Sequence, residues 1–275
     1  MTIHLYAMTW NERVMLPFFF RHYDRFVDRY FIFDDGSDDG TVELLKGRGN
    51  VEVQPLNYSQ PETYLGSQKD FMNSIWKRSR GKSDWVIIAD IDEHLYHPRL
   101  LSYLSAAKAA GVTMIPSYGF DMVSEEFPAE DELLEVTRTR GAPDQMYNKL
   151  RIFDPNAFSE MQFSLGGHMA LPQGRIVLPE TDEMVLLHYR HLGRENFLKR
   201  FRALATRQRA GDLAKGWLAH WKAEEERLRK RFAEKLAQTV DAVAPDAPAS
   251  HSEHRWWRAK TLFQAGATLR DVRLE

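Results

Sequence analysis

The chain of 275 residues contains no cysteine. Without thiols it can form neither disulfides nor thiolate-ligated zinc or iron–sulfur sites, and a cysteine nucleophile is excluded. The absence of cysteine fits a reducing compartment, and we expect a cytoplasmic protein. A catalytic or metal-binding site in this chain must use other side chains, chiefly carboxylates and histidines.

Long apolar runs and an excess of charge of one sign are also lacking. No segment reaches the roughly 18 apolar residues that a transmembrane helix needs, and the apolar stretch at 14–20 lacks the layout of a signal peptide. The 37 Lys and Arg nearly balance the 39 Asp and Glu, which argues against a nucleic-acid partner. Neither G-x-G-x-x-G nor G-x-x-x-x-G-K-[ST] occurs, so a nicotinamide site and a P-loop lack support.

The first 116 residues alternate between short apolar or β-branched runs and amphipathic stretches. This order predicts an α/β fold with a mainly parallel sheet, right-handed crossovers and flanking helices. Ligands of such sheets bind outside the carboxyl ends of the strands. Strands are expected at 3–8, 29–33, 51–53, 85–89 and 112–115, and helices after a cap at Asn11 and at 42–46, 61–80 and 99–110.

The pattern changes along the second half of the chain. Strands are expected at 150–153 and 184–189, and from Glu195 the sequence is helical, with a break at 245–250 and a last helix at about 253–265. We therefore divide the chain into an α/β domain at 1–193 and a helical C-terminal extension at 194–275.

Two acidic residues, Asp90 and Asp92, follow the apolar run 85–89, which suits a strand buried on both faces. Alternate residues converge where a strand ends in a turn, so the two carboxylates could hold Mg²⁺ or Mn²⁺. Carboxylates in such a place need either a cation or hydrogen bonds. A helix cap or a salt bridge is therefore the alternative.

Four aspartates crowd into the turn-rich loop 34–41. Helix capping by Ser37 or Asp39 explains part of this cluster. The loop matches the first positions of a calcium-binding EF-hand, but Lys46 stands where a bidentate glutamate is required, which excludes that site. A carboxylate here could instead accept hydrogen bonds from a nucleobase or a ribose.

Taken in order, these segments resemble the family 2 glycosyltransferases and their close relatives, which share the GT-A fold. The resemblance covers about residues 2–200, and the combination of motifs is more specific than any one of them. The matching segments are Thr9-Trp10-Asn11-Glu12, the D-D-G-S-D-D-G-T run at 34–41, the D-I-D-E run at 90–93, and Leu187-His188-Tyr189-Arg190 ahead of a Phe-containing helix.

The resemblance implies a nucleotide-sugar part at about 1–116 and an acceptor part at about 117–193. It implies a divalent metal, Mn²⁺ or Mg²⁺, held by Asp92 and His188, and a histidine ligand favours Mn²⁺. Such an ion acts as a Lewis acid on the departing nucleoside diphosphate.

The resemblance also assigns residues to the nucleotide sugar. Thr9 and Asp35, or its neighbour Asp34, would contact the base, and Asp90 would face the ribose. The remaining candidates are Asn11 and Glu12 in the matched segment, with Lys69 and Lys149 as candidates for phosphate contact or as ordinary surface lysines.

An inverting transferase needs a general base near the acceptor hydroxyl, with a pKa raised by burial. We favour Asp121, because its apolar setting at 118–122 would raise its pKa. The alternatives on the acceptor side are Glu125, Glu126, Asp182 and His168, and His168 could instead line the acceptor cleft. The base and the inverting stereochemistry stay open at this point.

The first part of the C-terminal extension is basic. Residues 194–235 contain 13 Lys and Arg against 6 Asp and Glu, whereas the whole chain has a net charge of −2. With Trp217 and Trp221, this segment could lie on the inner face of an anionic membrane or grip an anionic acceptor. Alternatively, it packs its apolar side on the catalytic domain and leaves a solvated face.

The function predicted from these residues is transfer of a sugar from a nucleotide diphosphate sugar, a UDP-sugar being favoured, to a hydroxyl acceptor. The acceptor would be a glycan or lipid-linked, in surface polysaccharide or glycolipid synthesis. The alternatives are a sugar-phosphate nucleotidyltransferase and a non-catalytic nucleotide- or acceptor-binding module on the same fold. A zinc site at His94 and His97 is a further alternative, although Pro98 argues against a helix there.

Overall fold

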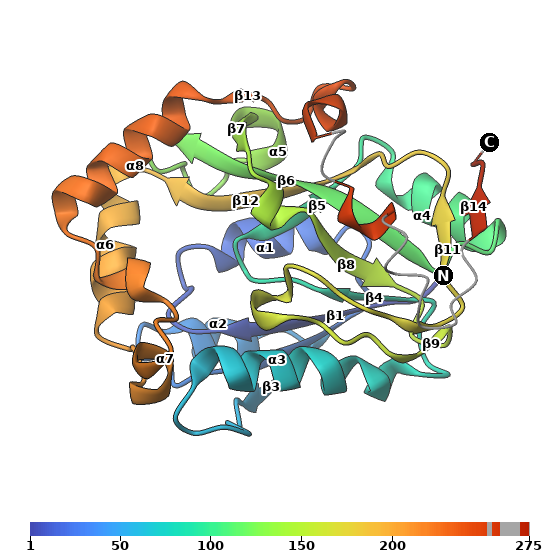
Figure 1. The fold of residues 1–275 in the computed structure, drawn as a ribbon, viewed down its shortest axis with the longest axis horizontal. Coiled ribbons are helices and arrows are strands. Elements are labelled where there is room, and N and C mark those ends of the chain that lie inside the picture. Colours follow the sequence, from blue (N-terminus) through green and yellow to red (C-terminus); the bar gives the residue numbers. More distant parts are fainter. Residues whose placement is uncertain (252–254, 259–269, 275) are drawn as a thin grey trace.

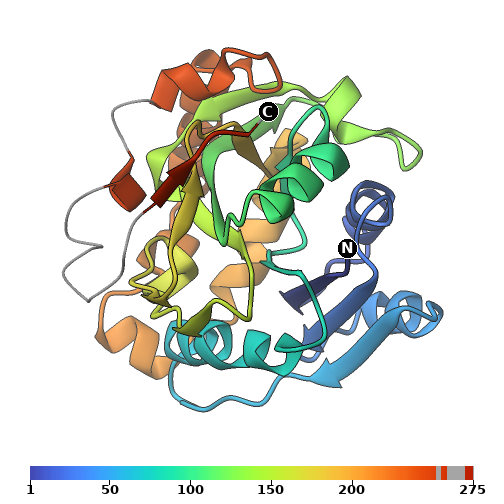
Figure 2. The same ribbon diagram turned by 90° about the vertical axis from the view of Figure 1, so that its right-hand side faces the viewer.

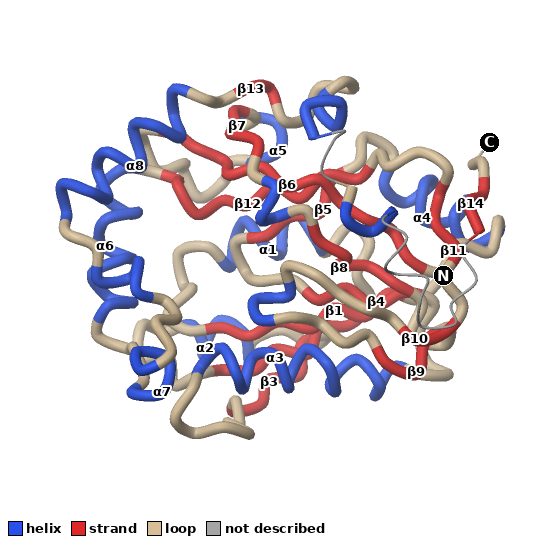
Figure 3. Tube along the Cα trace, in the orientation of Figure 1, coloured by secondary structure: helices blue, strands red, loops and turns tan. Residues whose placement is uncertain are grey.

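The computed structural model describes residues 1–251, 255–258 and 270–274. A ten-stranded sheet forms its centre, and helices flank that sheet (Figures 1 and 3). The strand order is β13-β7-β6-β8-β4-β1-β2-β3. In addition, β12 pairs with β6, and β5 pairs with β12. The predicted α/β class with a mainly parallel sheet is thereby confirmed.

The first part of the sheet is parallel throughout. It consists of β1 (Ile3–Thr9), β2 (Arg29–Asp34), β3 (Val51–Pro55) and β4 (Trp85–Ile88). β1 lies between β2 and β4, and β3 lies outside β2. The run 85–89 is buried throughout, as a central strand requires.

The helices expected at 61–80 and 99–110 are shorter than expected, and the one expected at 42–46 begins one residue earlier. The helices of this part are α1 (Leu16–Tyr23), α2 (Thr41–Lys46), α3 (Tyr64–Ser74), which continues as the 3₁₀ helix η1 (Ile75–Ser79), and α4 (Leu100–Ala109). The predicted cap at Asn11 is wrong, because Asn11 has φ +52° and the residue before α1 is Met15. Pro17 lies in the first turn of α1, where a proline is tolerated.

The second part of the sheet mixes directions. β8 (Lys149–Phe153) lies antiparallel between β4 and β6 (Met114–Ser124), and β6 is longer than the predicted strand at 112–115. β12 (Met184–Leu192) runs parallel to β6 and antiparallel to β5 (Glu93–Tyr96), a strand that the sequence reading missed.

Short elements complete the fold. They are α5 (Leu134–Thr137), β7 (Arg140–Pro143), the 3₁₀ helices η2 (Gln145–Tyr147) and η3 (Leu165–Gly167), β9 (Phe158–Glu160), β10 (Gln173–Gly174), β11 (Val177–Pro179) and β14 (Arg270–Val272). Most of the helix predicted at 253–265 lies outside the described residues, apart from Arg255 and the 3₁₀ turn η6 (Trp256–Arg258).

The first helices after residue 193 fold against the carboxyl ends of β1 and β2, on the left in Figure 1, and the chain then runs along the top of that view to β7. This part of the chain contains α6 (Arg194–Ala205), α7 (Ala210–Ala214), the 3₁₀ helix η4 (Ala219–Lys222), α8 (Glu225–Ala237), β13 (Val240–Asp241) and the 3₁₀ helix η5 (Ala247–His251). Val123 of β6 shares an apolar cluster with Phe197, Phe201 and Phe232 of α6 and α8. β13 joins the central sheet beside β7. The boundary at residue 193 stays a prediction.

Among the described residues, no helix is both long and apolar enough to cross a bilayer.

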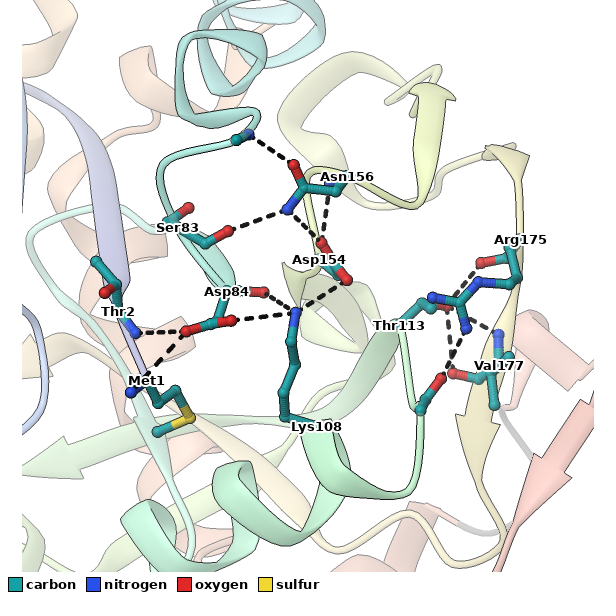
Figure 4. Close-up of polar contacts among 12 residues, drawn as sticks. Met1, Thr2, Ser83, Asp84, Lys108, Thr113, Asp154, Asn156, Arg175 and Val177 are labelled. Carbon is teal, nitrogen blue, oxygen red and sulfur yellow. Dashed lines mark hydrogen bonds and ion pairs between the residues drawn. The ribbon is translucent and has the colours of Figure 1, made fainter.

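A polar network ties α4 to the amino ends of β1 and β4 (Figure 4), at the end of the molecule that faces the viewer in Figure 2. Lys108 Nζ lies 3.4 Å from Asp84 Oδ1 and 3.1 Å from Asp154 Oδ2. Asp84 also accepts a hydrogen bond from the Thr2 N–H at 2.7 Å, and Asp154 accepts one from the Asn156 N–H at 2.8 Å. This network closes the end of the sheet opposite α6 and α8.

We predict that Asp154→Ala lowers the free energy of unfolding by about 1–2 kcal/mol, because the part-buried Lys108 ammonium and the Asn156 N–H lose an acceptor. Urea unfolding followed by circular dichroism measures this loss. Asp131→Ala is the matched control, since Asp131 is exposed and an exposed substitution changes stability by about 0.5 kcal/mol or less. Equal stability of the two variants would contradict the role given to the network.

Candidate active site

A cavity of about 550 Å³ lies at the carboxyl ends of β1, β2 and β4, beneath α6. Both acidic clusters meet at this edge of the sheet, as predicted. The cavity is lined by nine of the predicted residues, namely Thr9, Asn11, Glu12, Asp35, Asp90, Asp92, Lys149, His168 and His188. Asp34, Lys69 and Asp121 do not line it.

The two neighbouring aspartates at the end of β2 have different roles. Asp34 Oδ2 accepts hydrogen bonds from the N–H groups of Gly36 and Ser37, at 3.0 and 3.1 Å, and so forms the turn. Asp35 Oδ2 accepts hydrogen bonds from Tyr58 Oη and Arg207 Nη2, both at 2.6 Å, at the cavity wall. Of the two alternatives for the base contact, the structure places Asp35 at the cavity.

The other acidic residues of the loop hold the segment after β1. Asp38 exchanges two hydrogen bonds with the Asn11 amide, and Asp39 Oδ2 accepts one from the Arg13 N–H. Thr41 Oγ1 accepts another from the Glu12 N–H at 2.9 Å. The carboxylates of Asp38 and Asp39 therefore accept hydrogen bonds from one side-chain amide and one backbone N–H of the segment after β1, and both ends of the Asn11 side-chain amide are used within the protein.

The D-I-D-E run places three carboxyl groups in three environments. Burial and the charge of Glu93 raise the pKa of Asp90. Burial opposes ionisation of Asp92, but the nearby Arg200, His188 and Arg190 outweigh it and lower the pKa of Asp92. Glu93 is fully buried, and its two oxygens lie 2.6 Å from Lys149 Nζ and 3.3 Å from Arg151 Nη2.

The position of Asp92 suits a metal ion. Its Oδ2 is buried without a hydrogen-bond partner among the described residues, and it lies 3.6 Å from His188 Nε2. One carboxylate oxygen and one imidazole nitrogen facing the same cavity form a donor pair that suits Mn²⁺. Arg200 Nη2, 3.4 Å from Asp92 Oδ2 and 2.5 Å from Glu12 Oε1, supplies the countercharge.

The structure contradicts the prediction for Asp121. The side chain is fully buried outside the cavity wall, and burial alone would raise its pKa. His191, His188 and Lys235 outweigh burial and hold the pKa of Asp121 well below its ordinary value. The apolar residues next to Asp121 in sequence are therefore a poor guide to its surroundings in space, and Asp121 does not line the cavity.

The other candidates for the base divide clearly. Glu125 forms an exposed ion pair with Arg194, Glu126 is exposed, and Asp182 pairs with Arg258 outside the cavity. His168 does line the cavity, and its Nδ1 lies 2.6 Å from the Met146 carbonyl oxygen. Burial, followed by the charge of Lys149, lowers the pKa of His168 to about 4. Its ring is therefore neutral at neutral pH.

The two lysines considered for phosphate contact also differ. Lys69 is exposed on α3 and lies outside the cavity, so the structure does not bring it to the nucleotide-sugar site. Lys149 is buried and neutralises Glu93, so it is not a surface lysine.

The zinc alternative finds no support in the structure. His97 pairs with Glu183, at 3.2 Å, whereas His94 is enclosed in the core beside His22. Within the described residues, His22, His94 and Glu135 form a group of potential ligands. The His22 and His94 rings stack at 4.6 Å and 11°, so their lone pairs run side by side, and Arg25 already bonds Glu135. This arrangement does not converge on one ion.

Three arginines of the site were not predicted. Arg200 and Arg207 come from α6 and the turn after it and reach Glu12 and Asp35, which lie 188 and 172 residues earlier. Arg190, at the cavity wall, has no ion pair in the described part of the chain. Arg190 lies in the matched His-Tyr-Arg segment, so that motif could have identified it. Arg200 and Arg207 lie in no motif that could have identified them.

Comparison with known proteins gives one family. Residues 7–241 match the model of glycosyltransferase family 92. A family 92 protein of rice is 25% identical over 207 residues, covering 72% of this chain and 33% of the relative. One of Ricinus communis is 23% identical over 260 residues, covering 87% and 42%. The chain thus spans less than half the length of these relatives. Family 2 itself, which the motifs resemble, is not confirmed by this match.

Solved structures show more distant likeness. TarS 1–349 of S. aureus in complex with UDP-GlcNAc has a TM-score of 0.36 and 13% identity, covering 96% of this chain and 76% of that chain. Glucosyl-3-phosphoglycerate synthase of Mycobacterium tuberculosis has a TM-score of 0.29 and 20% identity, covering 43% and 44%.

The acidic loop also makes a prediction about its two left-handed glycines. Gly40→Ala should destabilise the protein by slightly more than the ~1–2 kcal/mol cost of a left-handed alanine, because its Cβ would lie 2.6 Å from Arg13 Nη1 and would push this flexible side-chain end off the Asp39 carbonyl oxygen. Gly36→Ala, with φ +75° and nothing within 4 Å of its Cβ, should show the left-handed cost alone. Urea unfolding of both variants measures the difference. A larger loss for Gly36→Ala would refute this account of the loop.

Proposed function

The chain belongs to glycosyltransferase family 92, and from that premise we propose that it transfers a sugar from a nucleotide diphosphate sugar to a hydroxyl acceptor. One observation carries the proposal. Asp92 Oδ2 and His188 Nε2 face each other at 3.6 Å in the same cavity that Thr9, Asp35 and Asp90 line. A metal-binding pair and a polar pocket for a nucleoside therefore share one space.

The proposed cofactor is Mn²⁺ or Mg²⁺, held by Asp92 and His188. When bound, such an ion neutralises charge that develops on the leaving diphosphate. Arg190 is placed to help, since a half-buried guanidinium without an ion pair in the described chain is suited to phosphate oxygens. Arg200 pairs with Asp92 and with Glu12. Its charge helps to hold the pKa of Asp92 below the ordinary value, whereas burial raises the pKa of Glu12 to about 7 despite Arg200.

The proposed nucleoside lies against β1 and β2. Thr9 Oγ1 is buried without a hydrogen-bond partner among the described residues, so it can bond the base. Asp35 accepts hydrogen bonds at the same wall, and Trp10 lies under the Arg207 guanidinium, 4.1 Å from ring centroid to Cζ. A UDP-sugar is the donor we favour, with Asp90 toward the ribose.

On the acceptor side, we now assign the general base to His168 in place of Asp121. The ring is neutral near pH 7, and its Nδ1–H donates to the Met146 carbonyl, so Nε2 keeps a lone pair for the acceptor proton. This role accords with an inverting reaction, which stays part of the proposal.

The wider role remains as proposed from the sequence: a cytoplasmic enzyme of surface polysaccharide or glycolipid synthesis, with a glycan or lipid-linked acceptor. A peripheral membrane contact through 194–235 would depend on side chains other than Arg200, Arg207 and Lys235, because these three point to carboxylates inside the protein.

We predict that Asp92→Asn lowers turnover of the preferred nucleotide sugar by about 10²–10³-fold in Mn²⁺, because the developing charge loses its stabilisation. Release of nucleoside diphosphate from a panel of nucleotide sugars, with and without acceptor mixtures, is the measurement. Asp131→Asn, an exposed carboxylate outside the cavity, is the control and should retain full activity. Unchanged metal-dependent turnover of Asp92→Asn would remove the metal assignment.

We predict that His168→Ala lowers kcat by about 10²–10⁴-fold, because it removes the proton acceptor. The affinity for UDP in calorimetry should stay unchanged, since His168 lies on the acceptor side. Met169→Ala tests disturbance of the same loop, because Met169 is half exposed and adjacent. A His168→Ala enzyme with normal kcat, or with UDP binding weakened in parallel, would exclude the assignment.

A further inference from the structure

His188 stands between two buried carboxylates. Its Nδ1 lies 3.0 Å from Asp121 Oδ1, and its Nε2 lies 3.6 Å from Asp92 Oδ2. The three side chains are exposed by 1%, 0% and 3%, so solvent does not compete for these contacts. The sheet register explains the arrangement, because His188 of β12 is paired with Asp121 of the parallel strand β6 and with Glu93 of β5.

An imidazole binds a metal through a nitrogen that carries a lone pair, so the proton of a neutral ring must sit on the other nitrogen. We propose that Asp121 is a positioning residue that accepts the His188 Nδ1–H and thereby keeps Nε2 free and directed at the Asp92 side of the cavity. This inference rests on the proposed function and replaces the role of general base that the sequence suggested for Asp121.

The second oxygen of Asp121 is fixed by the C-terminal helix α8. Lys235 Nζ lies 2.8 Å from Asp121 Oδ2 and 2.5 Å from Asp144 Oδ2. An ammonium group can only donate hydrogen bonds, so the side-chain atom of residue 121 that faces Lys235 must be an acceptor. The carboxylate satisfies both demands, since Oδ1 accepts the hydrogen bond from His188 and Oδ2 forms the ion pair with Lys235.

The neighbouring imidazole does not share this role. His191 Nδ1 lies 3.7 Å from Asp121 Oδ1, and neither of its ring nitrogens has a hydrogen-bond partner among the described residues. His188 is held further by the Tyr147 ring, whose centroid lies 4.1 Å away. Asp121 therefore orients the ring of His188, which lines the cavity.

An amide at position 121 has only one acceptor atom, so it can accept a hydrogen bond from Lys235 or from the His188 Nδ1–H, but not from both. In D121N the Lys235 ammonium would draw the amide oxygen toward itself, which turns the amide N–H₂ toward His188 Nδ1. The ring must then accept at Nδ1 and carry its proton on Nε2, where it cannot bind a metal. Removing the ammonium in D121N/K235M frees the amide to turn back and accept the Nδ1–H again.

The test is calorimetric titration of MnCl₂ into the full chain saturated with UDP. We expect D121N to bind Mn²⁺ about 10–100-fold more weakly than the unaltered protein, as loss of an outer partner of a histidine ligand typically does. D121N/K235M should recover most of that affinity, which a merely structural role would not predict. D154N is the matched control, since Asp154 is a buried aspartate paired with Lys108 far from the cavity, and it should bind Mn²⁺ normally.

The outcomes separate the two proposals. Absence of Mn²⁺ binding to the unaltered protein would overturn the metal part of the proposed function and this inference with it. Normal binding by D121N, or equal loss in D154N, would overturn this inference alone. If D121N does not fold, D121N/K235M carries the test, because it buries no unpaired ammonium, and weak binding by a folded double variant would count against the positioning role.

Discussion

The burial of several carboxylates at one edge of a sheet is the constraint on which the rest of this structure depends. Asp35, Asp92, Glu93 and Asp121 all lie at or beside the carboxyl ends of the strands, and each is at least largely withdrawn from water. A buried carboxylate is costly unless a cation or hydrogen bonds compensate it. The protein meets this demand with one or two cations for each carboxylate. Arg207 pairs with Asp35 and Arg200 with Asp92. Lys149 and Arg151 pair with Glu93, and Lys235 pairs with Asp121.

The origin of these cations explains the uneven charge along the chain. The basic stretch 194–235 looks like a candidate membrane surface when it is read alone. In the fold, Arg200, Arg207 and Lys235 from this stretch turn inward and pair with carboxylates of the acidic edge. The helices after residue 193 therefore complete the cavity as well as covering it.

The sequence predicted features that depend on neighbours along the chain. The apolar run 85–89 identified a central strand, and the turn chemistry of 34–41 identified a loop at the edge where Asp90 and Asp92 also end. Features that depend on distant partners were missed. Asp121 has apolar neighbours in sequence, but His188 and Lys235 lie beside it in space, 67 and 114 residues later. Nothing in the neighbouring sequence distinguishes Lys69 from Lys149. Only the pairing of β8 with β4 and β6 places Lys149 beside Glu93.

The separation of each carboxylate from its countercharge also bears on how the protein is made. Synthesis at roughly 5–20 residues per second delivers Glu93 before Lys149 and Asp121 before Lys235, and the second interval lasts about 6–23 s. A nascent chain that has already folded β1 to β4 therefore gains the cations for Glu93 with β8, and those for Asp35, Asp92 and Asp121 only when α6, the turn after it and α8 leave the ribosome. Repulsion among its own carboxylates disfavours packing of another surface against that edge until α6 and α8 bring their cations.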